Sequence, residues 1–301
     1  KSDDLVLFLL SGGGSALFEK PLLPPEELAD ITKQLLACGA DITEINTLRK
    51  RFSAVKGGKF AQLCAPAHVF SIVLSDILGD PLDMIASGPA YPDSTTSEQA
   101  QAIAKKFDLH LSDLARDLLT RETPKDLPNA ESRITGSVRQ LCAAASESAQ
   151  ALGYKPVVLT ASLCCEARDA GSFLASIAQY HADTKESLAF IAGGETVVHL
   201  TGHGKGGRNQ ELALAAARGI DGLRDTLVFS LGSDGTDGPT DAAGGWVDGT
   251  SLRRLAEKGY DLDAVLQDND AYHALSAVDG LILTGPTGTN VNDLSVLLIR
   301  R

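Results

Sequence analysis

The chain alternates short apolar runs with glycine-rich turns and helical patterns, and this alternation limits its fold more than any other feature. Most of the runs are followed by glycine and small polar residues, and then by a helical pattern. A helix over 137–152, with Gly153 as its C-cap, precedes one of them. This repeated order predicts an α/β protein. The predicted strands occupy 5–10, 69–74, 156–160, 188–192, 226–231 and 280–284.

The continuous apolar character of these runs predicts how the strands are arranged. Strands that are buried on both faces lack the alternation of half-exposed strands, so we expect mostly parallel or mixed sheets covered by helices. The polar stretch 181–187 predicts a boundary between two α/β domains, 1–185 and 186–301. Residues 121–134, which include two prolines, are predicted to form a loop. Ligands of such sheets bind at the carboxyl ends of the strands. The glycines and aspartates of this chain lie at these positions, directly after the predicted strands.

The net charge and the cysteine content limit the classes of binding partner and the cellular compartment that we expect for this protein. The net charge of −12 argues against nucleic acid or an anionic membrane, because both are bound largely through Lys and Arg. No apolar run approaches the roughly 18 residues of a membrane span. The five cysteines form an odd set without CxxC spacing, which favours reduced thiols in the cytoplasm over disulfides or structural zinc. We therefore expect a cytoplasmic protein with small-molecule partners.

The first glycine-rich segment consists of Ser11, Gly12, Gly13, Gly14 and Ser15, directly after an apolar run. Glycine lets backbone N–H groups approach an anion, so a phosphate or carboxylate would suit this segment. It is not the dinucleotide fingerprint, whose last glycine is missing, and it is not a Walker A loop, because no Gly-Lys-Ser/Thr follows. A tight turn without a ligand is the alternative.

A second glycine-rich stretch, 201–211, carries Lys205 and Arg208 and leads into the apolar helix 212–217. Two cations and free N–H groups at a helix N-terminus form an anion site through charge and helix dipole together. A solvated loop without function is the alternative.

Three aspartates, Asp234, Asp237 and Asp241, follow the run at 226–231. Their spacing does not match an EF-hand. Carboxylates clustered in a tight turn repel one another unless a cation or hydrogen-bond donors offset them, and Mg²⁺ shared with substrate phosphates would do so. Asx turns and helix caps are the competing interpretation.

Other strand ends add similar groups: Asp76 and Asp80 lie in one, and 285–293 supplies Thr, Asn and Asp. Glycine-rich donors, an Arg/Lys cluster and carboxylates at one sheet edge are the components of phosphoryl transfer. A serine hydrolase fits less well, because the chain contains no G-x-S-x-G elbow.

At these segments the chain resembles the glycerate 2-kinase family, whose C-terminal part is the MOFRL domain. The resemblance runs nearly end to end through LLSGGGSAL (9–17), EINTLRK (44–50), KGGK (56–59), LSDILGDPLDMIASGP (74–89), GGET (193–196), GKGGRNQELAL (204–214), GSDGTDGPTDAAG (232–244) and GPTGTNVNDL (285–294). It implies a Rossmann-like kinase domain over 1–185, a MOFRL domain over 186–301, and an active-site cleft between them.

The resemblance also implies an activity and its residues. Family members use ATP and Mg²⁺ to phosphorylate the 2-hydroxyl of D-glycerate, giving 2-phosphoglycerate. The resemblance implies catalytic roles for Arg208, Asp234 and Asp76, and metal binding by Asp234, Asp237 and Asp76. It implies contacts with substrate or nucleotide for these residues: Ser11, Gly12, Gly13, Gly14, Ser15, Glu195, Lys205, Asn209, Thr289 and Asn290.

Two departures from the family pattern accompany the resemblance. Family members carry about a hundred further N-terminal residues with a glycine-rich loop and a lysine, so we expect a chain beginning at Lys1 to be incomplete and inactive alone. Val138 stands where many members have Asn.

Two other functions stay open. Some members are named hydroxypyruvate reductase, but this chain lacks a dinucleotide fingerprint. A non-catalytic binder of a sugar acid or nucleotide is the second alternative, and a homodimer is compatible with the sequence.

Overall fold

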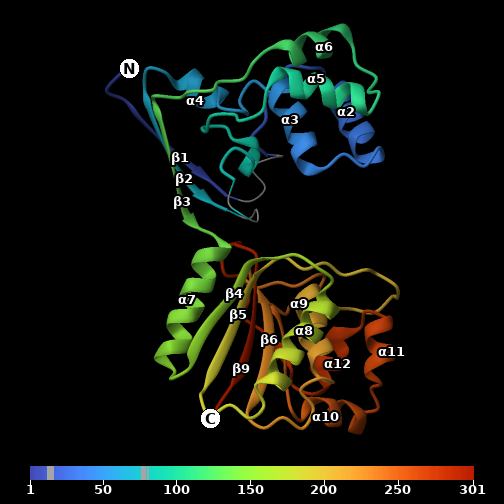
Figure 1. The fold of residues 1–301 in the computed structure, drawn as a ribbon. Helices are drawn as coiled ribbons and strands as arrows, with labels where there is room; N and C mark the ends of the chain where they lie inside the picture. Colours follow the sequence, from blue (N-terminus) through green and yellow to red (C-terminus); the bar gives the residue numbers. More distant parts are fainter. Residues whose placement is uncertain (12–16, 76–78, 80) are drawn as a thin grey trace. The chain divides into compact units, whose positions relative to one another are not determined.

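The computed structural model describes residues 1–11, 17–75, 79 and 81–301, and it divides the chain into two compact units, Lys1–Thr135 and Gly136–Arg301 (Figure 1). Both units combine helices with a sheet, so the predicted α/β class is confirmed. The boundary predicted between 185 and 186 lies inside the second unit. The reason is that β4 (Lys155–Leu163) and β5 (Leu188–Gly194), on either side of it, pair as parallel neighbours.

The first unit contains a three-stranded sheet in the order β1-β2-β3, with β1 and β2 parallel. Apolar residues of α2, α3, α5 and α6 form a helical core of their own. The elements are β1 (Leu5–Leu10), α2 (Pro25–Ala37), α3 (Ile42–Phe52), α4 (Lys59–Cys64), β2 (His68–Leu74), η1 (Ile85–Ser87), α5 (Ser97–Lys106), α6 (Asp113–Thr120) and β3 (Ala130–Gly136).

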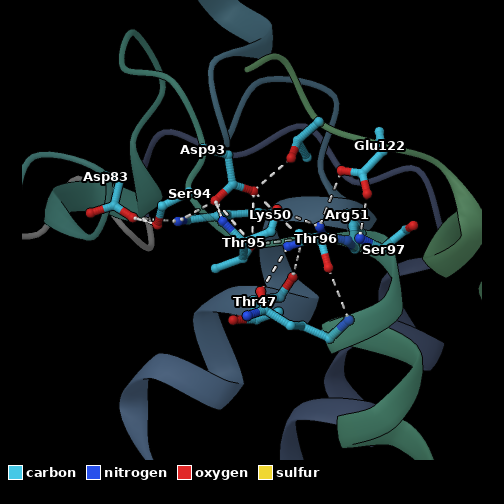
Figure 2. A network of polar contacts seen from close by, with 12 residues as sticks. Thr47, Lys50, Arg51, Asp83, Asp93, Ser94, Thr95, Thr96, Ser97 and Glu122 are labelled. Atoms are coloured by element: carbon cyan, nitrogen blue, oxygen red, sulfur yellow. Dashed lines mark hydrogen bonds and ion pairs between the residues drawn. The ribbon is translucent and has the colours of Figure 1, made fainter. Parts of the chain in front are cut away.

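A buried ionic network fixes α3 to the segment before α5 (Figure 2). The side chains of Lys50, Arg51 and Asp93 have no exposed surface, and Lys50 Nζ donates to Asp93 Oδ1 at 2.9 Å. Thr95 and Thr123 donate to the same carboxylate. Burial alone would raise the pKa of Asp93, but the bonds from Lys50, Thr95 and Thr123 lower it below its ordinary value. Lys50 also lies 3.4 Å from Asp83 Oδ2, and Arg51 lies 3.8 Å from Glu122 Oε2. Loss of Asp93 would therefore leave two buried cations with more distant counter-charges.

The second unit is built on a six-stranded mixed sheet in the order β4-β5-β9-β6-β7-β8. Helix α7 covers one face, and α8 and α9 lie on the other (Figure 1). The elements are α7 (Val138–Ala151), β4, α8 (Ala167–Tyr180), β5, α9 (Arg208–Ala216), β6 (Thr226–Gly232), β7 (Gly244–Asp248), α10 (Ser251–Glu257), α11 (Leu262–Gln267), α12 (Ala271–Ala277), β8 (Leu281–Ile282) and β9 (Asp293–Ile299).

The apolar runs at 5–10, 69–74, 156–160, 188–192 and 226–231 coincide with β1, β2, β4, β5 and β6, as predicted. The last run shrinks to the two residues of β8. Part of the predicted loop 121–134 is wrong, because Ala130–Gly136 forms β3, in which exposed and half-buried residues alternate. Strands β7 and β9 were not predicted. No helix in the described parts of the chain is long and apolar enough to cross a membrane.

Candidate active site

One edge of the second sheet gathers the segments that follow β5 and β6. β9 runs antiparallel between these strands, and its first residue, Asp293, pairs with Gly194 on one side and Gly232 on the other. Because β9 runs in the opposite direction, it begins where its neighbours end. The residues after β5, the residues after β6 and Asp293 therefore meet at one edge. The expectation of a single sheet edge holds only for these segments, because β1 and β2 belong to the separate three-stranded sheet.

Arg208 is the first residue of α9 and reaches two acids at this edge. Its Nε and Nη2 donate to Asp293 Oδ2 (2.5 Å) and Oδ1 (3.1 Å), and its Nη1 lies 3.0 Å from Glu195 Oε1. The Asp293 side chain is only 6% exposed, whereas that of Glu195 is 47% exposed. Burial by itself would lower the pKa of the Arg208 guanidinium, but Asp293, Glu195 and Asp237 raise it. Arg208 is therefore a permanently charged cation in a fixed position.

Asp237 accepts hydrogen bonds from the N-terminus of the same helix. Its Oδ1 accepts from the backbone N (3.1 Å) and Nδ2 (3.2 Å) of Asn209, and its Oδ2 accepts from the backbone N of Gln210 (2.9 Å). Gly207 allows this approach, since a Cβ there would collide with the Asp237 carboxylate. Burial raises the pKa of Asp237 to about 6 despite these bonds. Asp237 is thus a helix cap, the alternative that its sequence context left open.

The glycine-rich loop uses its backbone differently from our expectation. Five successive N–H groups, those of 201–205, donate to oxygens of residues 268–270, which follow α11. Acceptors of the chain itself therefore occupy the N–H groups of 201–205, so these five donors are not free to bind an anion.

Lys205, in the same loop, lies on an aromatic ring. Its ammonium nitrogen is 4.1 Å from the centroid of the Tyr272 ring, and the Tyr272 hydroxyl donates to Asp241 Oδ1 at 2.7 Å. Lys205 is half-buried. Asp241 is thus bound to a tyrosine hydroxyl.

Asp234 lies next to Asp293 where β6 ends. A Cβ built on Gly232 would be 3.2 Å from Asp234 Oδ1 and 3.6 Å from Asp293 Oδ1, so both carboxylates border the same glycine. Asp234 Oδ1 accepts from the backbone N of Thr236 at 2.9 Å. The Asp234 carbonyl accepts from the backbone N of Thr287, which joins this turn to the loop before β9. Arg208 and Asp234 therefore converge on Asp293.

The other predicted residues fall into four groups. Thr289 and Asn290 are exposed in the loop before β9. Asn209, expected to contact a ligand, is instead 1% exposed, and its Oδ1 accepts from Ser230 Oγ at 2.6 Å. Ser11 is exposed after β1 in the first unit. The remaining predictions, Gly12, Gly13, Gly14, Ser15 and Asp76, lie outside the described residues.

The donor set decides which residue could hold Mg²⁺. Among the described residues, no group of three or more His, Cys, Asp or Glu is placed to hold a metal ion. Asp237 uses both carboxylate oxygens as a cap, and both oxygens of Asp293 bind Arg208. Mg²⁺ is often held by one or two carboxylates together with substrate phosphates, and the half-buried Asp234 fits that requirement.

Comparison with known proteins identifies the family of this chain. Residues 1–120 match the model of a domain of unknown function, DUF4147, and residues 188–293 match the MOFRL family. The D-glycerate 2-kinase of Thermotoga maritima is 51% identical, over 99% of this chain and 73% of that protein. The glycerate 2-kinase of Pyrococcus horikoshii is 43% identical, over 99% and 71%. The chain belongs to the glycerate 2-kinase family.

A solved structure supports the same relationship. The crystal structure of glycerate kinase from Thermotoga maritima superposes with a TM-score of 0.96 at 50% identity, covering 100% of this chain and 74% of that one. In this member of the glycerate 2-kinase family, Asp293 was expected only as one of the carboxylates at the strand ends, not as the partner of Arg208. An acidic residue directly before the apolar run 294–299 is the signal that could have identified it.

Proposed function

We propose that this chain transfers a phosphoryl group from ATP to the 2-hydroxyl of D-glycerate, giving 2-phosphoglycerate. The observation that carries the proposal is Arg208, held by Asp293 and Glu195 with Asp234 beside Asp293. Phosphoryl transfer depends on positioning and charge stabilisation more than on covalent help from the protein. The relatives' printed names, D-glycerate 2-kinase and glycerate 2-kinase, support the acceptor.

In this proposal each residue of the edge has a separate task. Arg208 contacts the phosphoryl group in transfer, and the exposed Glu195 is the partner that it can release. Asp234 holds Mg²⁺ or accepts the proton of the 2-hydroxyl. Bound Mg²⁺ would supply positive charge that offsets the phosphates of ATP. Family resemblance alone supports Asp76 as a metal or acceptor contact.

The remaining contacts follow from position or resemblance. Lys205, Thr289 and Asn290 are accessible at the same unit's loops and would bind phosphate or glycerate oxygens. The segment from Ser11 to Ser15 is assigned a substrate contact by resemblance. The cysteines of the described residues are free thiols, which supports a reaction in the cytoplasm.

The first test measures the reaction itself in the full-length protein. ADP release should depend on D-glycerate and Mg²⁺, and phosphorus NMR should place the new phosphate on the 2-position. NADH oxidation with hydroxypyruvate, without ADP release from D-glycerate, would assign the reductase activity instead.

The second test measures the contribution of Arg208. Arg208→Ala should lower kcat/KM about 100-fold or more, because it removes a fixed charge at the reacting phosphate. Arg300→Ala is a matched control, since Arg300 is exposed just beyond the other end of β9. A loss below threefold for Arg208→Ala, or equal losses for both variants, would contradict the role of Arg208.

A further inference from the structure

The segment Asp268–Asn269–Asp270, between α11 and α12, binds the backbone of the glycine-rich loop along its length. Asn269 Oδ1 accepts from the N–H groups of Thr201 (2.8 Å) and Gly202 (3.0 Å). Asp268 and Asp270 accept the N–H groups of 203–205 through Asp268 Oδ1, Asp268 O and Asp270 Oδ1. The loop is therefore held by a continuous row of acceptors, in the way that an anion would hold it.

The glycines of the loop are explained by the same contacts. A Cβ on Gly202 would collide with Asp268, and a Cβ on Gly204 would collide with Asp270. The absence of side chains at these positions lets the loop backbone lie directly on the 268–270 segment. These two glycines therefore serve an internal contact rather than the approach of a phosphate.

Asn269 is the centre of this segment. It is 6% exposed and adopts a left-handed backbone conformation, φ 56°, which Asn tolerates better than most residues. Its Nδ2 donates to Glu211 Oε2 at 3.1 Å and to the carbonyl of His199. Both ends of one buried amide are thus engaged, the oxygen with the loop and the nitrogen with α9.

Glu211 connects this amide to the helix that begins with Arg208. It is 2% exposed and lies three positions after Arg208 in α9. Its Oε1 accepts from Nε (3.1 Å) and Nη2 (2.9 Å) of Arg168, so the Glu211 charge is compensated. Rotation of the Asn269 amide would place two donors against each other at the loop, and this fixes its orientation.

We propose that Asn269 is a positioning residue, which sets the place of Arg208 by joining the glycine-rich loop to α9 through Glu211. The inference rests on the proposed function, in which Arg208 contacts the phosphoryl group. Asn269 itself need not touch a substrate. Its effect should appear in the rate of phosphoryl transfer more than in the binding of D-glycerate.

The variant Asn269→Gly removes the side chain without straining the left-handed backbone. Asp279→Gly is the matched control, because Asp279 also has a positive φ (53°) after the neighbouring helix α12 and is exposed. Asn269→Gly should lower kcat at least tenfold with less than a threefold change in KM for D-glycerate, whereas Asp279→Gly should leave both nearly unchanged.

A double-mutant cycle with Arg208→Ala separates positioning from general loss of structure. If Asn269 acts through Arg208, Asn269→Gly should lower kcat less than twofold in the Arg208→Ala background. The same fold loss in both backgrounds, or no loss in the wild-type background, would overturn the proposal. If Asn269→Gly does not fold, Glu211→Gln takes its place, because one Gln oxygen cannot serve both Arg168 and Asn269.

Hydrogen exchange of the loop gives a readout that does not depend on activity. Amide exchange in 201–205 should rise at least tenfold in Asn269→Gly and stay unchanged in Asp279→Gly. Unchanged exchange in Asn269→Gly would overturn the proposal whatever the kinetics. A wild-type protein that releases no ADP with D-glycerate would instead reject the proposed function, and the exchange result alone would then decide whether Asn269 holds the loop.

Discussion

Asp293→Asn tests whether the buried carboxylate orients Arg208 or competes with phosphate for it. Asn keeps one oxygen acceptor but faces the other Arg208 donor with an NH₂ group, so one charged hydrogen bond is lost. Such a bond contributes roughly 1.5–3 kcal/mol. A loss of about 2 kcal/mol in the positioning of Arg208 corresponds to a drop of about 30-fold in kcat/KM.

Glu195→Gln is the control within the same cluster. Glu195 also pairs with Arg208, at 3.0 Å, but it is 47% exposed, and solvent-exposed ion pairs contribute about 0–1 kcal/mol. Its kcat/KM should fall no more than about fivefold. The measurements are initial rates of ADP release with D-glycerate, with melting temperatures to show that both variants are folded. A faster Asp293→Asn enzyme, or a larger loss in Glu195→Gln, would refute the orienting role.

Three further predictions concern single carboxylates. Asp234→Asn should raise the Mg²⁺ concentration needed for half-maximal activity about tenfold, because one metal ligand loses its charge; an unchanged titration would assign Asp234 to turn structure alone. Asp93→Asn should reduce the free energy of unfolding by about 3–5 kcal/mol, measured by urea denaturation, because Lys50 and Arg51 stay buried with the more distant Asp83 and Glu122 as their remaining counter-charges; a loss below about 1 kcal/mol would show that these two acids compensate the buried cations. Burial raises the folded-state pKa of Asp237 to about 6, so its proton stabilises the folded protein below pH 4, and this stability is lost as pH rises through 6. Relative to Asp237→Asn, the wild type should therefore lose about 2–3 kcal/mol between pH 4 and 7.5, and parallel stability curves for the two proteins would contradict this.

The fold was predictable where one physical signal dominated. Continuous apolar runs predicted β1, β2, β5 and β6. Burial on both faces explains this run in β5, whose residues are all buried. It does not explain β1, where Leu5, Leu7 and Leu9 are exposed. β3 was missed because its sequence, AESRITG, has the polar alternation of an edge strand and follows two prolines. β9 was missed because its apolar run begins directly after the polar loop 285–292, whose residue types also suit a ligand-binding loop.

The candidate site was predictable in composition but not in pairing. Arg208 and Asp234 were selected as residue types that suit phosphate chemistry, and the structure brings both to Asp293. The partner of Arg208 lies 85 residues away, and only the antiparallel insertion of β9 makes them neighbours. Asp237 and the loop glycines were expected to contact ligands. The local sequence does not reveal that the Asp237 carboxylate already accepts hydrogen bonds from backbone N–H groups of α9, or that the glycines lie against residues 268–270.

The central place of β9 has a consequence for synthesis. A ribosome releases β5 and β6 before residues 293–299, so the growing polypeptide exposes two unpaired strand edges until β9 follows. Arg208 then lacks Asp293, the buried one of its two acidic partners, as well. A premature stop codon shortly before residue 293 would remove the central strand β9 together with Asp293. The ion pair of Arg208 with Asp293 therefore forms only in chains whose synthesis has continued through β9.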